Sequence, residues 1–178
     1  VNFRYLDIRW SNLCNFKCRF CSYEHSSSWL ADTLALDGEN AKEDVKAGKV
    51  IALDLPWPEV EQHVLPHVEK VHLAGGEPLL MEQTYRLLQG LIDLGRTDVQ
   101  ISIVTNLSRL RFRDYDIFDL IEPFANVSFS VSVDGFGSRL EYMRKGADWD
   151  RLLENLNEAK RRFLSLEKVR TFKIFMSV

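Results

Sequence analysis

Apolar residues recur along the chain at two spacings, and segments of the two kinds alternate. Short runs rich in β-branched and aromatic residues predict strands at residues 3–10, 71–74, 99–104, 126–133 and 169–178. Between them, apolar residues recur every three or four positions, which predicts helices at residues 56–68, 80–94, 115–121 and 148–163. Residues 31–50 are charged and lack a strong period, so we expect them to be irregular or partly helical.

The order of these segments, a strand then a helix four times and a final strand, indicates an α/β fold with parallel strands. Polar and glycine residues follow four of the strands: the loop after residue 10, Gly75-Gly76-Glu77, Thr105-Asn106 and Asp134-Gly135. The C-terminal ends of parallel strands meet at one edge of a sheet. We therefore expect these four segments to form a single site.

The composition narrows the class of protein. The 178 residues suffice for one domain, and 46% hydrophobic residues suffice for a core without disulfides. The net charge of −3 does not suggest a nucleic-acid-binding protein. No apolar run is long enough to cross a bilayer, so nothing suggests a membrane protein. The first residues lack the apolar stretch of a signal peptide, so a cytoplasmic location is expected. The chain opens without Met and stops inside an apolar run, as expected of a piece of a longer protein.

All three cysteines of the chain lie within eight residues. Cys14, Cys18 and Cys21 have the spacing C-x3-C-x2-C, and Phe20 directly precedes the last of them. Their odd number argues against a disulfide framework. Three thiolates on one loop can hold three corners of an iron–sulfur cluster and leave one iron open for chemistry. The alternative is a zinc site completed by His25, four residues after Cys21.

This cysteine motif after a first strand, with Gly-Gly-Glu-Pro at 75–78 after a second, resembles the radical S-adenosylmethionine (SAM) superfamily. The resemblance covers nearly the whole chain, and it is closest to the branch whose members carry SPASM or twitch extensions. It implies a partial (β/α)6-type barrel, of which this chain holds about five strands. Residues 1–178 would then be an incomplete radical SAM core, with the rest of the barrel and any extension beyond residue 178.

The resemblance also implies the ligands. Cys14, Cys18 and Cys21 would bind a [4Fe–4S] cluster whose fourth iron is chelated by the amino and carboxylate groups of SAM. Phe20 would pack beside the adenine, and Arg144 is a candidate for the methionine carboxylate. The other implied SAM-binding residues are glycine or polar residues at strand ends: Gly75, Gly76, Glu77, Asn106, Ser130, Ser132 and Asp134. Of these, Glu77 would pair with the methionine ammonium.

The implied reaction is reductive. An electron donor such as flavodoxin or ferredoxin would supply one electron, SAM would be cleaved to methionine and a 5′-deoxyadenosyl radical, and the radical would abstract hydrogen from a substrate. A peptide or small metabolite is the expected substrate, with a peptide favoured because SPASM and twitch relatives often modify peptides. Two alternatives stay open: a non-catalytic iron–sulfur scaffold, and an RNA-modifying enzyme that uses the alternating Arg109, Arg111 and Arg113. The simpler interpretation of these arginines is a solvated loop.

Several other residues carry weaker expectations. His63 and His67 have the spacing of a helical metal pair, but no third ligand is near in sequence, so we expect them to face solvent. His72, within a short apolar run, is expected to lie in the core. Tyr23 and Trp29 follow the cysteine motif closely and are candidates for the wall of a substrate pocket.

Overall fold

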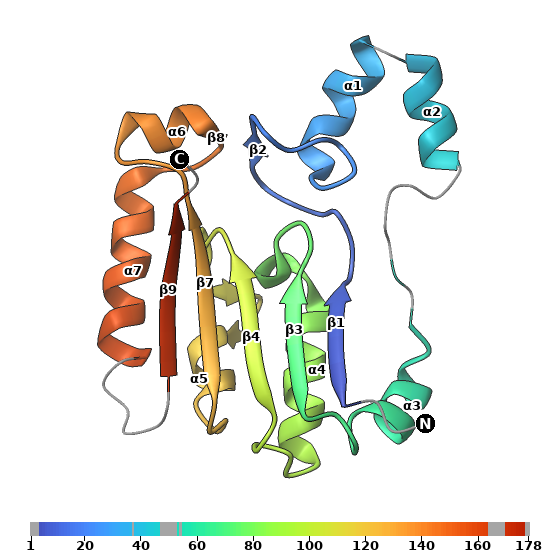
Figure 1. The fold of residues 1–178 in the computed structure, drawn as a ribbon, viewed down its shortest axis with the longest axis vertical. Helices are drawn as coiled ribbons and strands as arrows, with labels where there is room; N and C mark the ends of the chain where they lie inside the picture. The colour runs from blue at the N-terminus through green and yellow to red at the C-terminus, as the bar shows by residue number, and fades with distance from the viewer. Residues whose placement is uncertain (1–3, 37, 47–52, 54, 164–169, 177–178) are drawn as a thin grey trace.

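The computed structural model describes residues 4–36, 38–46, 53, 55–163 and 170–176. Its centre is a five-stranded sheet in the order β1-β3-β4-β7-β9, in which all neighbouring strands are parallel (Figure 1). The strands are Tyr5–Arg9 (β1), Lys70–Ala74 (β3), Gln100–Thr105 (β4), Val127–Val133 (β7) and Arg170–Met176 (β9). Each corresponds to a predicted strand, so the α/β class and the partial barrel are confirmed.

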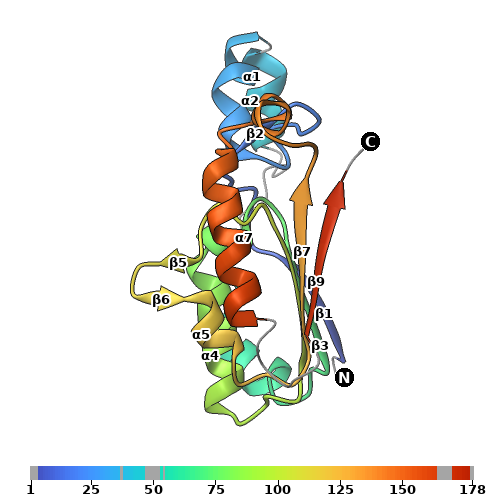
Figure 2. The same cartoon turned by 90° about the vertical axis from the view of Figure 1, so that its left-hand side faces the viewer.

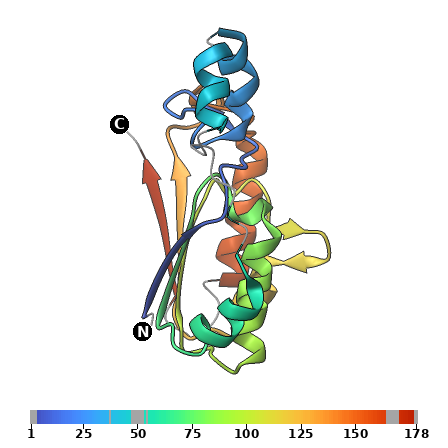
Figure 3. The same cartoon turned by 90° about the vertical axis from the view of Figure 1, so that its right-hand side faces the viewer.

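The helices that the structure describes pack on one face of this sheet. Three of them connect successive strands: Glu82–Asp93 (α4), Ile117–Ile121 (α5) and Trp149–Phe163 (α7). Figures 2 and 3 show all three on the same side of the sheet. Strand residues that face them, such as Ile103 and Phe129, are fully buried. The alternate residues of the same strands, such as Ser102 and Ser130, are only half-buried, because no described helix covers their face.

The open face explains the position of His72, which is half-buried rather than in the core as predicted. Along β3, Val71 and Leu73 point toward the helices, so His72 points the opposite way. Its Nδ1 lies 3.2 Å from Ser102 Oγ on β4. His63 and His67, in the last part of the connection that precedes β3, are exposed as predicted.

The connection from β1 to β3 is the most elaborate. It contains Leu30–Leu36 (α1), Gly38–Lys46 (α2), Trp57–Glu59 (α3) and the π-helical Val60–Val64 (η2). The expected partly helical character of residues 31–50 is confirmed for residues 31–36 and 38–46, and residues 37 and 47–50 lie outside the described residues. In Figure 1, α1 and α2 extend beyond the C-terminal edge of the sheet. None of the α1 residues is buried.

The helix predicted at residues 115–121 begins two residues later than expected. Tyr115–Asp116 (β6) instead pairs antiparallel with Arg111–Phe112 (β5). Asp116 starts the helix because its carboxylate accepts a hydrogen bond from the backbone N–H of Phe118 (2.9 Å). The sequence pattern also missed several short elements: Lys17–Cys18 (β2), Pro78–Leu80 (η3), Ser138–Met143 (α6) and Arg144–Lys145 (β8).

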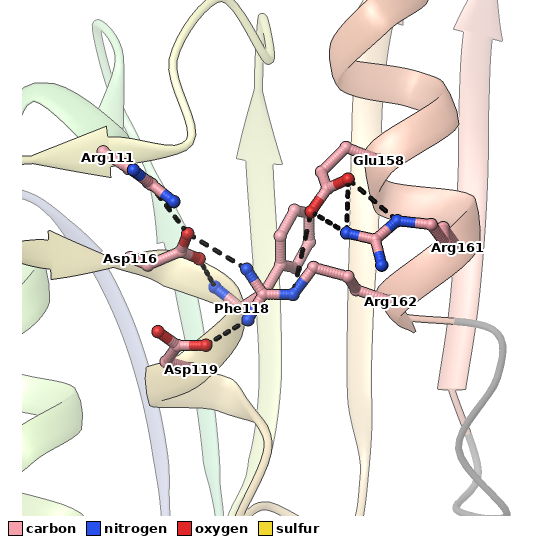
Figure 4. Close-up of polar contacts among 7 residues, drawn as sticks. All are labelled: Arg111, Asp116, Phe118, Asp119, Glu158, Arg161 and Arg162. Carbon is pink, nitrogen blue, oxygen red and sulfur yellow. Dashed lines mark hydrogen bonds and ion pairs between the residues drawn. The ribbon is translucent and has the colours of Figure 1, made fainter.

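The arginines at 109–113 lie in this hairpin and its approach, and two of them are in ion pairs. Arg111 contacts Asp116 (3.2 Å), which also binds Arg162 of α7 (3.0 Å), as Figure 4 shows. Arg113 is paired with Glu82 at the start of α4 (2.9 Å). Both side chains are largely exposed, at 78% and 63%, which agrees with the expectation of a solvated loop, and their ion pairs connect the hairpin to the neighbouring helices. Among the described residues, no helix has the length and apolar character needed to cross a bilayer.

Candidate active site

All three cysteines line one cavity of ≈ 290 Å³ at the C-terminal edge of the sheet. Loops that follow β1, β3, β4 and β7 contribute to it, which confirms that the strand-end segments converge. Its lining residues are Cys14, Phe16, Cys18, Phe20, Cys21, His25, Ser26, Gly75, Gly76, Val104, Thr105, Asn106, Ser132 and Arg144. A second cavity of ≈ 150 Å³ adjoins it and shares Phe16, Asn106, Ser132 and Arg144.

The cysteine loop is held by contacts on both sides. Its middle forms β2, which pairs with β8, and the indole N–H of Trp29 donates to the carbonyl of Cys18 (2.8 Å). The buried hydroxyl of Ser26 donates to the carbonyl of Phe16 (2.6 Å). Trp29 therefore anchors the loop and, contrary to the prediction, does not line the cavity. Tyr23 does not line the cavity either, and its carbonyl accepts a hydrogen bond from the side chain of Asn12 (2.6 Å).

Gly75 and Gly76 bring the loop after β3 against the cysteine loop. Gly76 N–H donates to the carbonyl of Ser11 (3.1 Å), and Glu77 N–H donates to that of Leu13 (2.7 Å). A Cβ on Gly76 would lie 2.2 Å from the Leu13 oxygen, and Gly75 has a φ of +120° that side chains rarely adopt. The glycines thus let two backbones meet, while both also line the cavity.

Glu77 is buried beneath the cavity rather than in its lining. Its carboxylate accepts hydrogen bonds from Thr105 Oγ1 (2.6 Å), Asn106 N–H (2.6 Å) and Leu79 N–H (3.1 Å). Burial raises the pKa of Glu77 to about 7, although these three hydrogen bonds act in the opposite direction. Glu77 therefore joins the loop after β3 to the end of β4.

Asn106 connects the end of β4 to the cysteine loop. Its side-chain amide donates to Asn15 Oδ1 (3.1 Å) and points toward Cys14 Sγ at 3.9 Å. Its side-chain oxygen accepts the backbone N–H of Ser108 (2.9 Å). These contacts keep the amide at the cavity wall, where it is 7% exposed.

Arg144 forms a buried ion pair with Asp134 at the end of β7. Their Nε and Oδ2 atoms are 2.5 Å apart, and both side chains are almost fully buried. Arg144 Nη1 also lies 3.7 Å from Cys18 Sγ, and its guanidinium is 5.1 Å from the centre of the Phe20 ring. Asp134 does not line the cavity; it holds the arginine that does.

The chemistry of the thiols fits a metal cluster. All three cysteines are free, and metal binding requires them as thiolates. A hydrogen bond from Cys18 lowers the pKa of Cys21 to about 7 and raises that of Cys18, and burial raises the pKa of Cys14. Three soft sulfur donors facing one cavity are the ligand set of an iron–sulfur cluster.

The zinc alternative needs four ligands around one ion. His25 lines the same cavity, and its Nδ1 is 3.1 Å from Ser22 Oγ. Within the described ranges, no three His, Cys, Asp or Glu side chains are grouped closely enough to hold one metal ion. Thiolates that bind three different irons of a cluster lie farther apart than the ligands of a single ion, so this spacing is compatible with a cluster.

Most of the predicted site residues meet at the cavity, and three do not line it. The three outside the lining are Glu77, Ser130 and Asp134. Ser130 lies on the open face of the sheet, two residues before Ser132 on β7. Sequence reasoning missed Phe16 and Ser26 as lining residues; the one available signal for Ser26 is that it opens a serine run shortly after the cysteines.

The fold and the site define a class: a partial parallel α/β barrel with three thiols facing one cavity at the C-terminal edge of its strands. The sequence model of the radical SAM superfamily matches residues 8–173. The chain therefore belongs to the radical SAM superfamily, which confirms the expected family and the expected type of enzyme.

Individual relatives agree with this assignment. The chain is 26% identical over 156 residues to a GTP 3′,8-cyclase of Sulfurimonas denitrificans, covering 87% of this chain and 42% of that protein. It is 26% identical over 113 residues to a GTP 3′,8-cyclase of Campylobacter lari, covering 64% and 30%. The chain thus spans less than half the length of these curated relatives.

Solved structures share the fold. The structure of anSMEcpe with bound AdoMet superposes with a TM-score of 0.58 at 20% identity, covering 97% of this chain and 43% of that chain. SuiB of Streptococcus suis, bound to its precursor peptide SuiA, superposes with a TM-score of 0.57 at 17% identity, covering 100% and 34%. At these identities the likeness supports the fold.

Proposed function

We propose that the protein containing this chain holds a [4Fe–4S] cluster on Cys14, Cys18 and Cys21 and cleaves SAM reductively. The observation that carries the proposal is the cavity in which all three thiols face the loops after β3, β4 and β7. When bound, the cluster supplies the electron that cleaves SAM to methionine and a 5′-deoxyadenosyl radical, which abstracts hydrogen from the substrate. Membership of the family by itself gives only the type of enzyme, and this proposal adds the cluster ligands and the reaction.

The chain's own residues would bind and orient SAM. We assign the methionine part to the ≈ 290 Å³ cavity, where Gly75 and Gly76 present backbone groups beside the thiols. The adenosine part would lie in the same cavity, past Ser132 and Asn106 and beside Phe20. Phe20, 52% exposed, is free to pack on the adenine as the resemblance implies.

Glu77 and Asp134 would act through other residues. Glu77 positions the backbone of Asn106, and Asp134 fixes the guanidinium of Arg144 at the cavity wall. Fixed polar groups of this kind orient a bound molecule without reorganising when it binds. Ser130, on the open face below the cavity, would meet the substrate rather than SAM.

A peptide or small metabolite is the proposed substrate. SuiB is solved with a precursor peptide, which accords with a peptide substrate. The curated relatives are named as GTP 3′,8-cyclases, which favours a small nucleotide as the second candidate. Three expectations stay predictions: a SPASM or twitch extension, a cytoplasmic location, and the status of residues 1–178 as an incomplete core.

The decisive experiment uses the full-length protein, reconstituted anaerobically with iron and sulfide and reduced with dithionite. We expect methionine and 5′-deoxyadenosine to form from SAM, as measured by mass spectrometry, and Cys18→Ala to abolish both. A full iron complement without SAM cleavage would support the non-catalytic scaffold instead. Bound zinc without iron would support the Cys3His site.

A further inference from the structure

On one side, a two-stranded strip borders the cysteine cavity. The strands β2 and β8 pair antiparallel, and Cys18 and Arg144 line the cavity, one from each strand. Side chains alternate along a strand, so Lys17, Arg19 and Lys145 lie on the outer side of the strip. The strip continues past β2, because the backbone N–H of Arg19 donates to the carbonyl of Met143 (2.9 Å).

The outer side of this strip is basic, in a chain whose net charge is −3. Lys17 is paired with Asp32 (2.5 Å), whereas neither Arg19 nor Lys145 forms an ion pair with any residue that the structure describes. The Arg19 guanidinium lies 3.7 Å from the ring centre of Tyr142, which is 60% exposed. We call these four residues, Lys17, Arg19, Tyr142 and Lys145, the basic patch.

The basic patch lies directly behind the thiol ligands. Lys145 follows Arg144, whose Nη1 is 3.7 Å from Cys18 Sγ, and Arg19 follows Cys18 itself. A protein bound at the patch would lie next to the residues that line the cysteine cavity without entering the cavity assigned to SAM. The nearest acidic side chain of α6, Glu141, is engaged with the backbone N–H of Trp149 (3.0 Å).

We propose that the basic patch docks the acidic one-electron carrier that reduces the cluster. This inference rests on the proposed function, since only a bound cluster gives such a carrier an electron acceptor. In the step, the carrier is oxidised by one electron and the cluster is reduced by one electron, and no covalent bond forms or breaks. Electron-transfer encounters use small interfaces and are steered by complementary charge, with an exposed aromatic such as Tyr142 as an apolar anchor.

The test compares Lys145→Glu with Lys70→Glu in the full-length protein. Both changes reverse an exposed charge, but Lys70 opens β3 at the opposite, N-terminal edge of the sheet. The probe is a bacterial flavodoxin: its Kd for the cluster-free protein is measured by calorimetry, and its reduction of the reconstituted cluster by stopped-flow absorbance. We expect Lys145→Glu to weaken the Kd about tenfold and slow cluster reduction similarly, with both effects shrinking at high salt.

The controls separate this inference from the proposed function. Lys70→Glu should match the wild type with flavodoxin, and Lys145→Glu should match it in SAM cleavage driven by dithionite, which needs no docking. Equal flavodoxin binding by Lys145→Glu and wild type, or equal weakening by both variants, would overturn the docking proposal. A wild type that binds flavodoxin at the patch but never cleaves SAM with dithionite would contradict the proposed function while supporting the patch.

Discussion

Replacing Glu77 by Gln should change stability in a way that depends on pH. The carboxylate is 1% exposed and accepts three hydrogen bonds, two of them at 2.6 Å. Gln keeps one acceptor oxygen but places an N–H₂ group where the second oxygen was. The backbone N–H of Asn106 or the hydroxyl of Thr105 then loses its partner, which costs about 1–3 kcal/mol for a buried group.

The ionisation of Glu77 adds a pH dependence that the Gln variant lacks. Burial raises its pKa from 4.5 to about 7, which corresponds to about 3 kcal/mol because one pKa unit is about 1.36 kcal/mol. The folded state binds the proton more tightly than the unfolded state. The contribution of Glu77 is therefore fully present below about pH 4.5 and is lost as the pH rises through about 7.

Urea unfolding of the full-length, cluster-free protein at pH 5, 6, 7 and 8 would measure this difference. At pH 5 the wild type should be more stable than Glu77→Gln by about 1–3 kcal/mol. By pH 8 that advantage should shrink by up to about 3 kcal/mol, so the variant could become the more stable protein. A difference that stays constant from pH 5 to 8, or that grows with pH, would refute the argument from burial.

Two further predictions concern the backbone contact and the buried ion pair. Gly76→Ala should destabilise the protein by about 1–3 kcal/mol and lower the iron content after reconstitution, because its Cβ would lie 2.2 Å from the Leu13 oxygen. Gly38→Ala, whose Cβ meets nothing within 4 Å, is the matched control, and equal iron in both variants would contradict this reading. Arg144→Leu should cost about 3–5 kcal/mol in urea unfolding because it leaves the Asp134 carboxylate buried and unpaired. The double variant Arg144→Leu with Asp134→Asn should be more stable than Arg144→Leu alone. Equal stability of the two would show that the loss does not come from the buried, unpaired carboxylate.

Local sequence signals were sufficient for the strands and for the three thiols that line the cavity. The five strands follow from runs of apolar residues, and the cysteine spacing lies within one loop, so neither depends on how distant segments pack. The same holds for α7, where Asp148 precedes an apolar helical period and accepts the backbone N–H of Arg151 (3.0 Å). The start of α5 was misplaced because the pairing of Tyr115 with Phe112 competes with the helix pattern.

The sequence by itself therefore determined the family, the order of the elements and which residues have the chemistry to bind a cluster. The tertiary structure decided what each strand-end residue does. Glu77 resembles a ligand contact in sequence, but its carboxylate meets Thr105, 28 positions away, and the Arg144 guanidinium reaches Cys18 across 126 positions. The physical reason is that a buried charge needs polar partners, and these come from segments that only the folded chain brings together. Spacing along the sequence does not show which segments those are.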